Sequence, residues 1–331
     1  MNLVTGGTGL VGSHLLLTLL KKGRPVIALK RASSNIKEVE EIFSYYTPDY
    51  KELYNKIIWR EGDLNDVLGF DELLKDVTAV YHCAALVSLD DKDKDHLLRA
   101  NKEGTANLVN ACINNKIEAF CFVSSIATLQ NKDITTEVDE KVFWKTAPDQ
   151  SAYSLSKYLA EQEVWRGMEE GLNAVIVNPG VIVGPGNWGR GTGQLVSLSA
   201  KGIKFYTQGE TGFVGAIDVA GAMAALMEKK VFGERFILVE NNYPFKHILD
   251  RIHTELGKPL PKIKAGPGLL TLGKWFSFLM PAGQKMTSST ISALSTKTTF
   301  SNKKLGQFLD YKYTTIDECI KFASKCYQTR V

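Results

Sequence analysis

The sequence feature that most constrains the fold is a glycine-rich turn near the start of the chain, in LVTGGTGLVGSHLLLTLLKKG (residues 3–23). A short apolar strand precedes the glycines, and the leucine-rich stretch after them predicts a helix that ends at Gly23. Because glycine has no Cβ, Gly6 permits a tight turn, Gly9 lets the backbone approach a pyrophosphate, and Gly12 lets helix and strand pack closely. The N–H groups of the first helical turn would then face the phosphates. This position between strand and helix favours a dinucleotide-binding turn over a purely structural one.

Apolar strands and helical patterns alternate through the first half of the chain. Strands rich in Val, Ile, Phe and Ala are predicted at residues 25–30, 56–64, 79–85, 119–127 and 173–184. Helical patterns separate them, including one long helix at residues 96–115 and another that contains YSLSK. Continuous apolar strands separated by helices predict an α/β fold with a doubly wound, Rossmann-like parallel sheet.

The regular alternation ends after Gly184. A glycine-rich loop is expected at residues 185–194 and one more strand at residues 235–240. This change in pattern predicts two parts, a dinucleotide-binding Rossmann domain and a smaller C-terminal substrate-binding lid. We expect the first to comprise residues 1–180 plus about 213–240, and the second about 181–212 plus 241–331.

Composition and charge argue against several classes of protein. The chain has 331 residues and a net charge of +4 without a basic run, which argues against nucleic-acid binding. Its five scattered cysteines form no CxxC pair, so we expect reduced thiols, no metal site and a cytoplasmic location. We see no signal-peptide pattern. The apolar segment Leu269–Met280 is too short to span a membrane, and a pocket-lining or core helix is favoured over membrane contact.

The end of the second predicted strand bears on the choice between NAD and NADP. An Asp or Glu there would accept hydrogen bonds from the ribose 2′-OH of NAD, but no carboxylate is present. Arg31 could bind a 2′-phosphate, helped by Lys30 or Ser33, unless these cations are simply solvated. NADP(H) is therefore the preferred cofactor and NAD(H) the alternative. Asp63 ends another strand, where it would either accept from the adenine amine or cap the next helix.

A tyrosine and a lysine four residues apart, in YSLSK, give the strongest indication of chemistry. On a helix Tyr153 and Lys157 share one face. A phenol has an ordinary pKa of about 10, which a neighbouring ammonium and a nicotinamide cation would lower, so Tyr153 could exchange protons near neutral pH. Ser125 ends an apolar strand, where its hydroxyl could orient a substrate oxygen towards Tyr153 or simply bond to local backbone groups.

These motifs together resemble the extended short-chain dehydrogenase/reductase family, also called the NAD-dependent epimerase/dehydratase family. The resemblance covers most of the chain and rests on TGGTGLVG, GDL, YHCAA, NKEGT, VSSIA, YSLSK, NPGVIVGPG and FSNKKLG. It implies a Ser–Tyr–Lys catalytic triad, which we assign to Ser125, Tyr153 and Lys157. The residues predicted to contact the cofactor are Gly6, Thr8, Gly9, Leu10, Val11, Gly12, Lys30, Arg31, Asp63, Leu64, Ala84, Ala85, Tyr153, Lys157, Pro179 and Ile182.

The resemblance also implies particular roles within that set. Ala84 and Ala85 would line the adenosine side of the cofactor, and the backbone from Pro179 to Ile182 would face the nicotinamide carboxamide. Lys157 would hold the nicotinamide ribose. Asn101 matches a motif asparagine whose role could be only to tie a helix to a strand.

The motif NPGVIVGPG distinguishes branches within this family. It resembles the dihydroflavonol-reductase, cinnamoyl-CoA-reductase and 3β-hydroxysteroid-dehydrogenase branch, which implies a weakly charged substrate. Nucleotide-sugar enzymes usually carry an asparagine where this chain has Val181, although Arg190 could substitute in binding a diphosphate. Trp188 and the segment Leu269–Met280 would suit an aromatic or aliphatic ligand, or would belong to ordinary core packing.

Three functional hypotheses follow. The preferred one is an NADP(H)-dependent oxidoreductase that moves a hydride reversibly between nicotinamide C4 and a small-molecule carbonyl or alcohol. The first alternative is a nucleotide-sugar epimerase or dehydratase that uses the same triad and retains NAD(P). The second is a dinucleotide-sensing binding protein without activity. A homodimer, as in many family members, would form through the helical segments Asp93–Asn115 and Ser151–Glu170.

Overall fold

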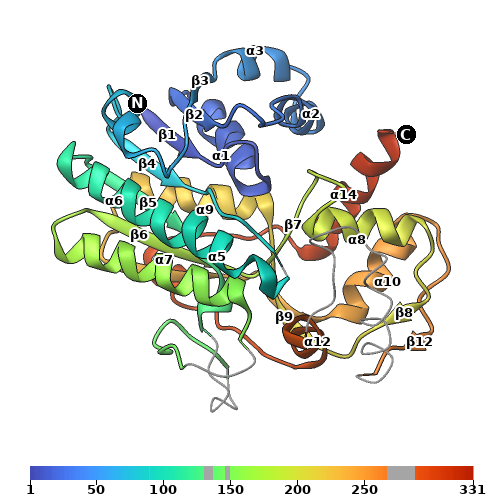
Figure 1. Cartoon of the computed structure of the whole chain (residues 1–331). Coiled ribbons are helices and arrows are strands. Elements are labelled where there is room, and N and C mark those ends of the chain that lie inside the picture. Colours follow the sequence, from blue (N-terminus) through green and yellow to red (C-terminus); the bar gives the residue numbers. More distant parts are fainter. Residues whose placement is uncertain (89, 130–136, 146–149, 267–287, 331) are drawn as a thin grey trace.

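The computed structural model describes residues 1–88, 90–129, 137–145, 150–266 and 288–330 (Figure 1). The segment Leu269–Met280 lies outside this described part, so its predicted role stays a prediction. Within the described residues, every helix is too short or too polar to cross a membrane.

A seven-stranded sheet forms the centre of the molecule, with the strand order β10-β6-β5-β4-β1-β2-β3. All neighbouring strands run parallel, and Val4 of the first strand in the chain pairs with Ala28 on one side and Tyr81 on the other. The doubly wound, Rossmann-like parallel sheet is therefore confirmed. Its strands are β1 (Asn2–Thr5), β2 (Val26–Lys30), β3 (Ile58–Glu61), β4 (Ala79–His82), β5 (Ala119–Val123), β6 (Ala174–Pro179) and β10 (Glu234–Leu238).

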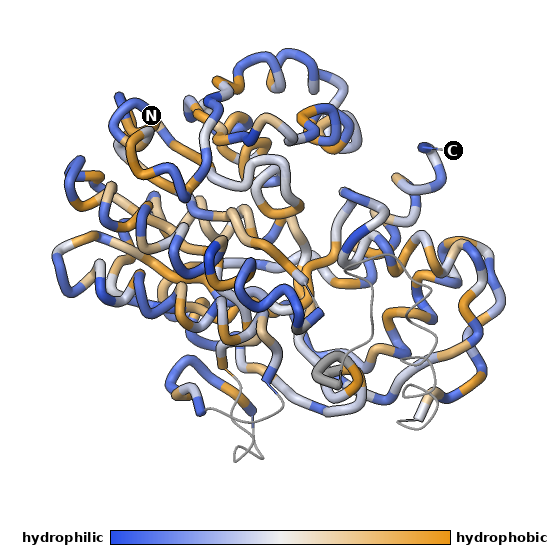
Figure 2. The backbone as a smooth tube through the Cα atoms, in the orientation of Figure 1, coloured by the Kyte–Doolittle hydropathy of each residue, from blue (hydrophilic) through white to orange (hydrophobic). Residues whose placement is uncertain are grey.

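Helices cover both faces of this sheet, as Figure 1 shows. Alternate strand residues face opposite sides, so Leu3 and Val4 belong to two different apolar cores. On the Val4 side pack α1 (Leu10–Lys21), α2 (Lys37–Tyr46), α3 (Tyr50–Asn55) and α9 (Ala216–Glu228). On the Leu3 side pack α4 (Phe70–Leu73), α6 (Gly104–Asn114) and α7 (Ala152–Glu169). Figure 2 shows that hydrophobic residues are concentrated in the central part of the molecule and that polar residues are frequent on the outer helices.

The long helix predicted before β5 is divided into three parts. It consists of α5 (Lys94–Leu97), a π-helical turn η3 (Leu98–Glu103) and α6. The π-helical turn contains Asn101, whose buried amide bonds to groups outside the helix. A π turn widens the helix locally and commonly occurs where a side chain has such a second task.

A smaller three-stranded sheet follows, in the order β11-β9-β7. Only Gly180 separates β6 from β7, and a Cβ there would lie 2.4 Å from the Gly212 carbonyl oxygen. The helices α8, α10 and α14 share an apolar core with this sheet. The elements of this part are β7 (Val181–Val183), α8 (Gly191–Ala200), β8 (Phe205–Tyr206), β9 (Glu210–Gly215), β11 (Asn241–Pro244), α10 (Phe245–Glu255), β12 (Ile263–Lys264), α12 (Ser288–Ser295), α13 (Leu305–Phe308) and α14 (Ile316–Thr329).

The loop expected at residues 185–194 is shorter than predicted, because α8 begins at Gly191. Glycine disfavours helix, which made this stretch look irregular in the sequence. Packing explains one of the glycines: a Cβ at Gly193 would lie 2.3 Å from the Asn187 carbonyl oxygen. The close approach of this backbone outweighs the low helix propensity.

Candidate active site

The turn between β1 and α1 has the geometry that its glycines predict. Gly6 adopts φ +66°, in the left-handed region, and a Cβ there would lie 2.6 Å from the Ala84 backbone nitrogen. A Cβ at Gly12 would lie 2.1 Å from the Gly6 carbonyl oxygen. Gly6 thus packs directly on the chain leaving β4, and Gly12 packs on the turn itself. No other residue fits either position without moving the backbone.

The N-terminus of α1 offers free hydrogen-bond donors at this turn. Gly9 is the exposed N-cap residue and has no side chain to cap the helix. Within the described residues, the backbone N–H groups of Leu10, Val11 and Gly12 have no hydrogen-bond partner. Open N–H groups at a positive helix end beside a glycine form a site that suits a phosphate. The residues present therefore fit the diphosphate of a dinucleotide.

The residues predicted to contact the adenosine half lie at the ends of neighbouring strands. The Lys30 ammonium is paired with Glu61 at 2.8 Å, whereas the exposed Arg31 guanidinium has no ion-pair partner among the described residues. Asp63 accepts from the backbone and side-chain nitrogens of Asn65 at 2.9 and 3.0 Å. The sequence left open whether Asp63 binds the adenine amine or caps the next helix. Its contacts in the structure are those of a local turn. Arg31 is the cation that remains available to a 2′-phosphate.

The loop after β4 is held in place by Asn101. The Asn101 side chain accepts from the Leu86 N–H at 2.7 Å and donates to the Leu86 carbonyl and the Ser156 hydroxyl, both at 2.9 Å. The Ala84 N–H donates to the Thr5 hydroxyl at 3.2 Å. Asn101 thus ties its helix both to the loop after β4 and to α7. The other residues predicted to contact the cofactor differ in exposure. Thr8, Ala84, Ala85 and Ile182 are partly buried or exposed, whereas Leu64 and Pro179 are buried.

The three predicted catalytic residues converge at the carboxyl end of β5. Ser125 follows this strand, and its hydroxyl lies close enough to the Tyr153 phenol to affect the pKa of that group. Lys157 lies one turn further along α7 and donates to the Val123 carbonyl at 2.7 Å. The helix is started at Ser151, which accepts from the N–H of the third helical residue. Two elements far apart in sequence therefore bring a hydroxyl, a phenol and an ammonium together.

Burial shifts the protonation equilibria of both α7 residues. It raises the pKa of Tyr153, and the Ser125 hydroxyl opposes this only in part. It lowers the pKa of Lys157 to about 8, while the carboxylate of Glu161 acts in the opposite direction. Lys157 is not among the groups that shift the Tyr153 pKa here, and its effect together with a bound nicotinamide cation stays a prediction. The ammonium bonds to the Val123 carbonyl, and the phenolate would have to form without water.

Sequence reasoning missed a buried polar cluster beside the triad, centred on Glu161. Its partners, within hydrogen-bonding distance of the carboxylate, are Ser124, Thr128, Trp165, Asn178 and Arg235. One signal was available: Glu161 follows Lys157 by four residues, as Lys157 follows Tyr153, so the three share one helix face. Trp165 lies one turn further along the same helix, whereas Ser124, Thr128, Asn178 and Arg235 come from other segments of the chain.

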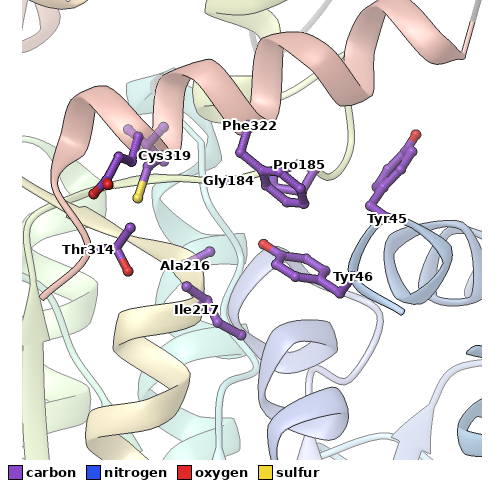
Figure 3. Close-up of a pocket in the computed structure, with 11 residues that line it drawn as sticks. Tyr45, Tyr46, Gly184, Pro185, Ala216, Ile217, Thr314, Cys319 and Phe322 are labelled. Carbon is purple, nitrogen blue, oxygen red and sulfur yellow. The ribbon is translucent and has the colours of Figure 1, made fainter. Parts of the chain in front are cut away.

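A separate cavity of about 240 Å³ lies between α2, the chain after β7, α9 and α14 (Figure 3). The rings of Tyr46 and Phe322 lie in its wall, with their centroids 4.8 Å apart. None of its lining residues belongs to the triad or to the predicted cofactor contacts. Trp188 is 5% exposed and packs edge-on against Tyr327, so of its two interpretations the structure supports core packing.

Comparison with known proteins places the chain in a family. A model of the NAD-dependent epimerase/dehydratase family matches residues 2–238. A protein from Synechocystis sp. that bears a provisional dihydroflavonol 4-reductase name is 32% identical over 267 residues, which cover 78% of this chain and 73% of that protein. The crystal structure of gox2253 has a TM-score of 0.82 and 27% identity, covering 100% of this chain and 98% of the other. UDP-glucose 4-epimerase from Thermus thermophilus, solved with NAD, has a TM-score of 0.76 at 20% identity and covers 100% and 99%.

A parallel sheet whose first strand leads into this glycine-rich turn, in a chain with these relatives, defines an NAD(P)-dependent enzyme of the extended short-chain dehydrogenase/reductase class. The match over most of the chain shows which family it is: the protein belongs to the NAD-dependent epimerase/dehydratase family. The resemblance stated from the sequence motifs is confirmed.

Proposed function

We propose that the protein is an NADP(H)-dependent carbonyl reductase that also works in reverse as an alcohol dehydrogenase. The observation that carries this proposal is the convergence of Ser125, Tyr153 and Lys157 at the carboxyl end of a strand in the same parallel sheet whose first strand leads into a helix end suited to a diphosphate. The substrate would be a small, weakly charged carbonyl compound. The reductase name of the Synechocystis relative supports this branch of the family.

The residues of the triad would divide the work of carbonyl reduction. When bound, the reduced nicotinamide supplies a hydride to the carbonyl carbon. Ser125 donates a hydrogen bond to the carbonyl oxygen and fixes its position, and Tyr153 gives that oxygen a proton. The Lys157 ammonium then stabilises the phenolate and holds the nicotinamide ribose. Lys157 is buried and Tyr153 partly buried, which limits the access of bulk water to the transferred proton.

NADP(H) is proposed as the preferred form of the cofactor because of Arg31. The second strand ends without a carboxylate for a ribose 2′-OH. With Lys30 paired to Glu61, the exposed Arg31 guanidinium supports binding of a 2′-phosphate. NAD(H) remains the alternative cofactor.

Purified protein mixed with NADPH and a panel of ketones and aldehydes tests this function by loss of absorbance at the reduced nicotinamide band. Tyr153→Phe should lower kcat roughly 10²- to 10⁴-fold, because the proton donor is lost. Tyr158→Phe is the matched control, since this tyrosine lies on the same helix and stacks on Trp144 at 4.5 Å. Full turnover by folded Tyr153→Phe would overturn the assignment.

A nucleotide-sugar epimerase or dehydratase is the second candidate. The fold shared with the Thermus thermophilus epimerase is compatible with it, and Arg190 is exposed at the start of α8 without an ion-pair partner among the described residues. This activity predicts tightly retained cofactor, conversion of a nucleotide sugar and no net consumption of NADPH. Consumption of NADPH in proportion to alcohol formed would decide for the reductase.

A further inference from the structure

Glu161 is a carboxylate buried inside the protein, with its side chain 1% exposed. One oxygen accepts from the Ser124 hydroxyl at 2.5 Å, the Thr128 hydroxyl at 2.9 Å and the Asn178 amide at 2.9 Å. The other accepts from the Arg235 guanidinium at 3.1 Å and the Trp165 indole at 3.4 Å. An isolated buried charge is costly, and these five donors offset that cost.

The donors to Glu161 enclose the backbone of the predicted catalytic serine. Ser124 directly precedes Ser125 in the chain. Asn178, on the neighbouring strand β6, also donates to the Ser125 carbonyl at 3.2 Å. The Thr128 hydroxyl lies 2.9 Å from the same carbonyl and 2.9 Å from Glu161, so its single proton is shared between these two acceptors. The position of Ser125 is therefore fixed from three directions by groups that share one carboxylate.

Glu161 also lies one helical turn from Lys157, on the same face of α7. The Lys157 ammonium is 4.3 Å from the centre of the Phe122 ring and bonds to the Val123 carbonyl. The titratable groups that interact with it are Glu161 on its own helix, and His82 and Cys83 from β4 and its end. Among these, the negative charge of Glu161 stabilises the ammonium against desolvation.

Arg235 completes the arrangement from β10. Its remaining N–H groups donate to the carbonyls of Glu140 and Val142 at 2.6 to 2.8 Å, so its charge is held beside Glu161. A cation held beside Glu161 should weaken the attraction that the carboxylate exerts on the Lys157 ammonium. We therefore expect Glu161 and Arg235 to act on Lys157 in opposite directions.

We propose that Glu161 is a positioning residue of the active site, whose buried carboxylate fixes the strand end that carries Ser125 and keeps Lys157 protonated, with Arg235 setting the strength of this effect. The role in turnover rests on the proposed reductase function. The effect on Lys157 belongs to the protein itself and can be measured without cofactor or substrate.

The direct test is titration of Lys157 in the cofactor-free protein, by NMR of ¹³Cε-labelled lysine with Lys157→Arg to assign the signal. The wild-type midpoint is expected at about pH 8. Glu161→Gln should lower it by about one pH unit, since an attractive charge is removed. Arg235→Gln should raise it, because Glu161 is then less compensated. Glu163→Gln, a charge removal on the same helix where the carboxylate pairs with Arg166 at 3.0 Å, should leave it unchanged.

Shifts of opposite sign separate this proposal from a merely structural role, which would lower the melting temperature without moving the midpoint in both directions. If Glu161→Gln fails to fold, Arg235→Gln decides: an unchanged or lower midpoint overturns the proposal. In turnover, the alkaline limb of the kcat/KM profile should move in the same directions. If Tyr153→Phe kept full activity, the reductase mechanism would fail while the NMR result for Glu161 would still stand or fall on its own.

Discussion

At the scale of single residues, close contacts separate the functional glycines from the ordinary ones. Gly6 and Gly23 both adopt φ between +66° and +69°, so both pay the same backbone penalty on substitution. A Cβ at Gly6 would collide with the backbone of Ala84, whereas nothing lies within 4 Å of a Cβ at Gly23. Left-handed geometry alone therefore does not distinguish the turn proposed to bind phosphate from an ordinary helix end.

Gly6→Ala should consequently destabilise the protein by more than Gly23→Ala. The control variant should lose about 1–2 kcal/mol of unfolding free energy, from the left-handed conformation alone. Gly6→Ala has the same conformational cost and in addition must displace the backbone at Ala84, so it should destabilise the protein further and also abolish cofactor binding. Urea unfolding of both variants, with NADPH binding by fluorescence, checks this. Equal losses for the two variants would show that the Ala84 contact is unimportant.

Arg31→Ala should weaken NADPH binding roughly 10- to 100-fold, as expected for loss of a charge-assisted hydrogen bond. NADH binding should stay unchanged, because NADH has no 2′-phosphate. Lys30→Ala is the control and should change either affinity little, since that lysine pairs with Glu61. Equal affinity of the wild type for both cofactors would contradict the phosphate site.

At the scale of secondary-structure elements, the central structure was readable from sequence and the connections between elements were not. Alternating apolar strands and helices predicted the sheet, and the spacing of Tyr153 and Lys157 predicted a shared helix face. The π-helical turn within residues 96–115 was missed, because helical periodicity does not record where one extra residue is inserted. The Glu161 cluster was missed because its members meet only when five elements pack.

Asn101→Ala tests what the π-helical turn contributes. The variant loses three hydrogen bonds to Leu86 and Ser156, and we expect a loss of about 1–3 kcal/mol in unfolding free energy. Release of the loop after β4 should also raise the KM for NADPH. Asn114→Ala, at an exposed position on α6, should change neither quantity. A loss of stability with unchanged KM would remove the link between this turn and the cofactor.

At the scale of the whole molecule, two buried histidines couple folding to pH. His14 bonds to the Leu10 carbonyl at 2.7 Å and the Tyr46 hydroxyl at 2.9 Å, and His82 bonds to two threonine hydroxyls at 2.7 and 2.9 Å. Burial lowers their pKa values to about 4 and about 3. Both rings therefore stay neutral in the folded protein at pH values where the unfolded chain would bind protons.

Stability should fall as pH drops from about 6.5, the ordinary histidine pKa, towards 4. At pH 5 each ring should account for about 2 kcal/mol of lost unfolding free energy. Urea unfolding at pH 7 and pH 5 measures the loss, and His82→Gln should show a smaller difference between the two pH values than the wild type. An identical difference in the variant would mean that His82 is already accessible to protons.

The junction at Gly180 has a consequence for how such a molecule can move. Gly180 alone joins β6 of the large sheet to β7 of the small sheet, and its packing against Gly212 leaves no space for a side chain. Close packing at this residue leaves little room for the backbone to bend there. We therefore expect any opening that admits a substrate to come from the segments around the strand ends rather than from bending between the two sheets.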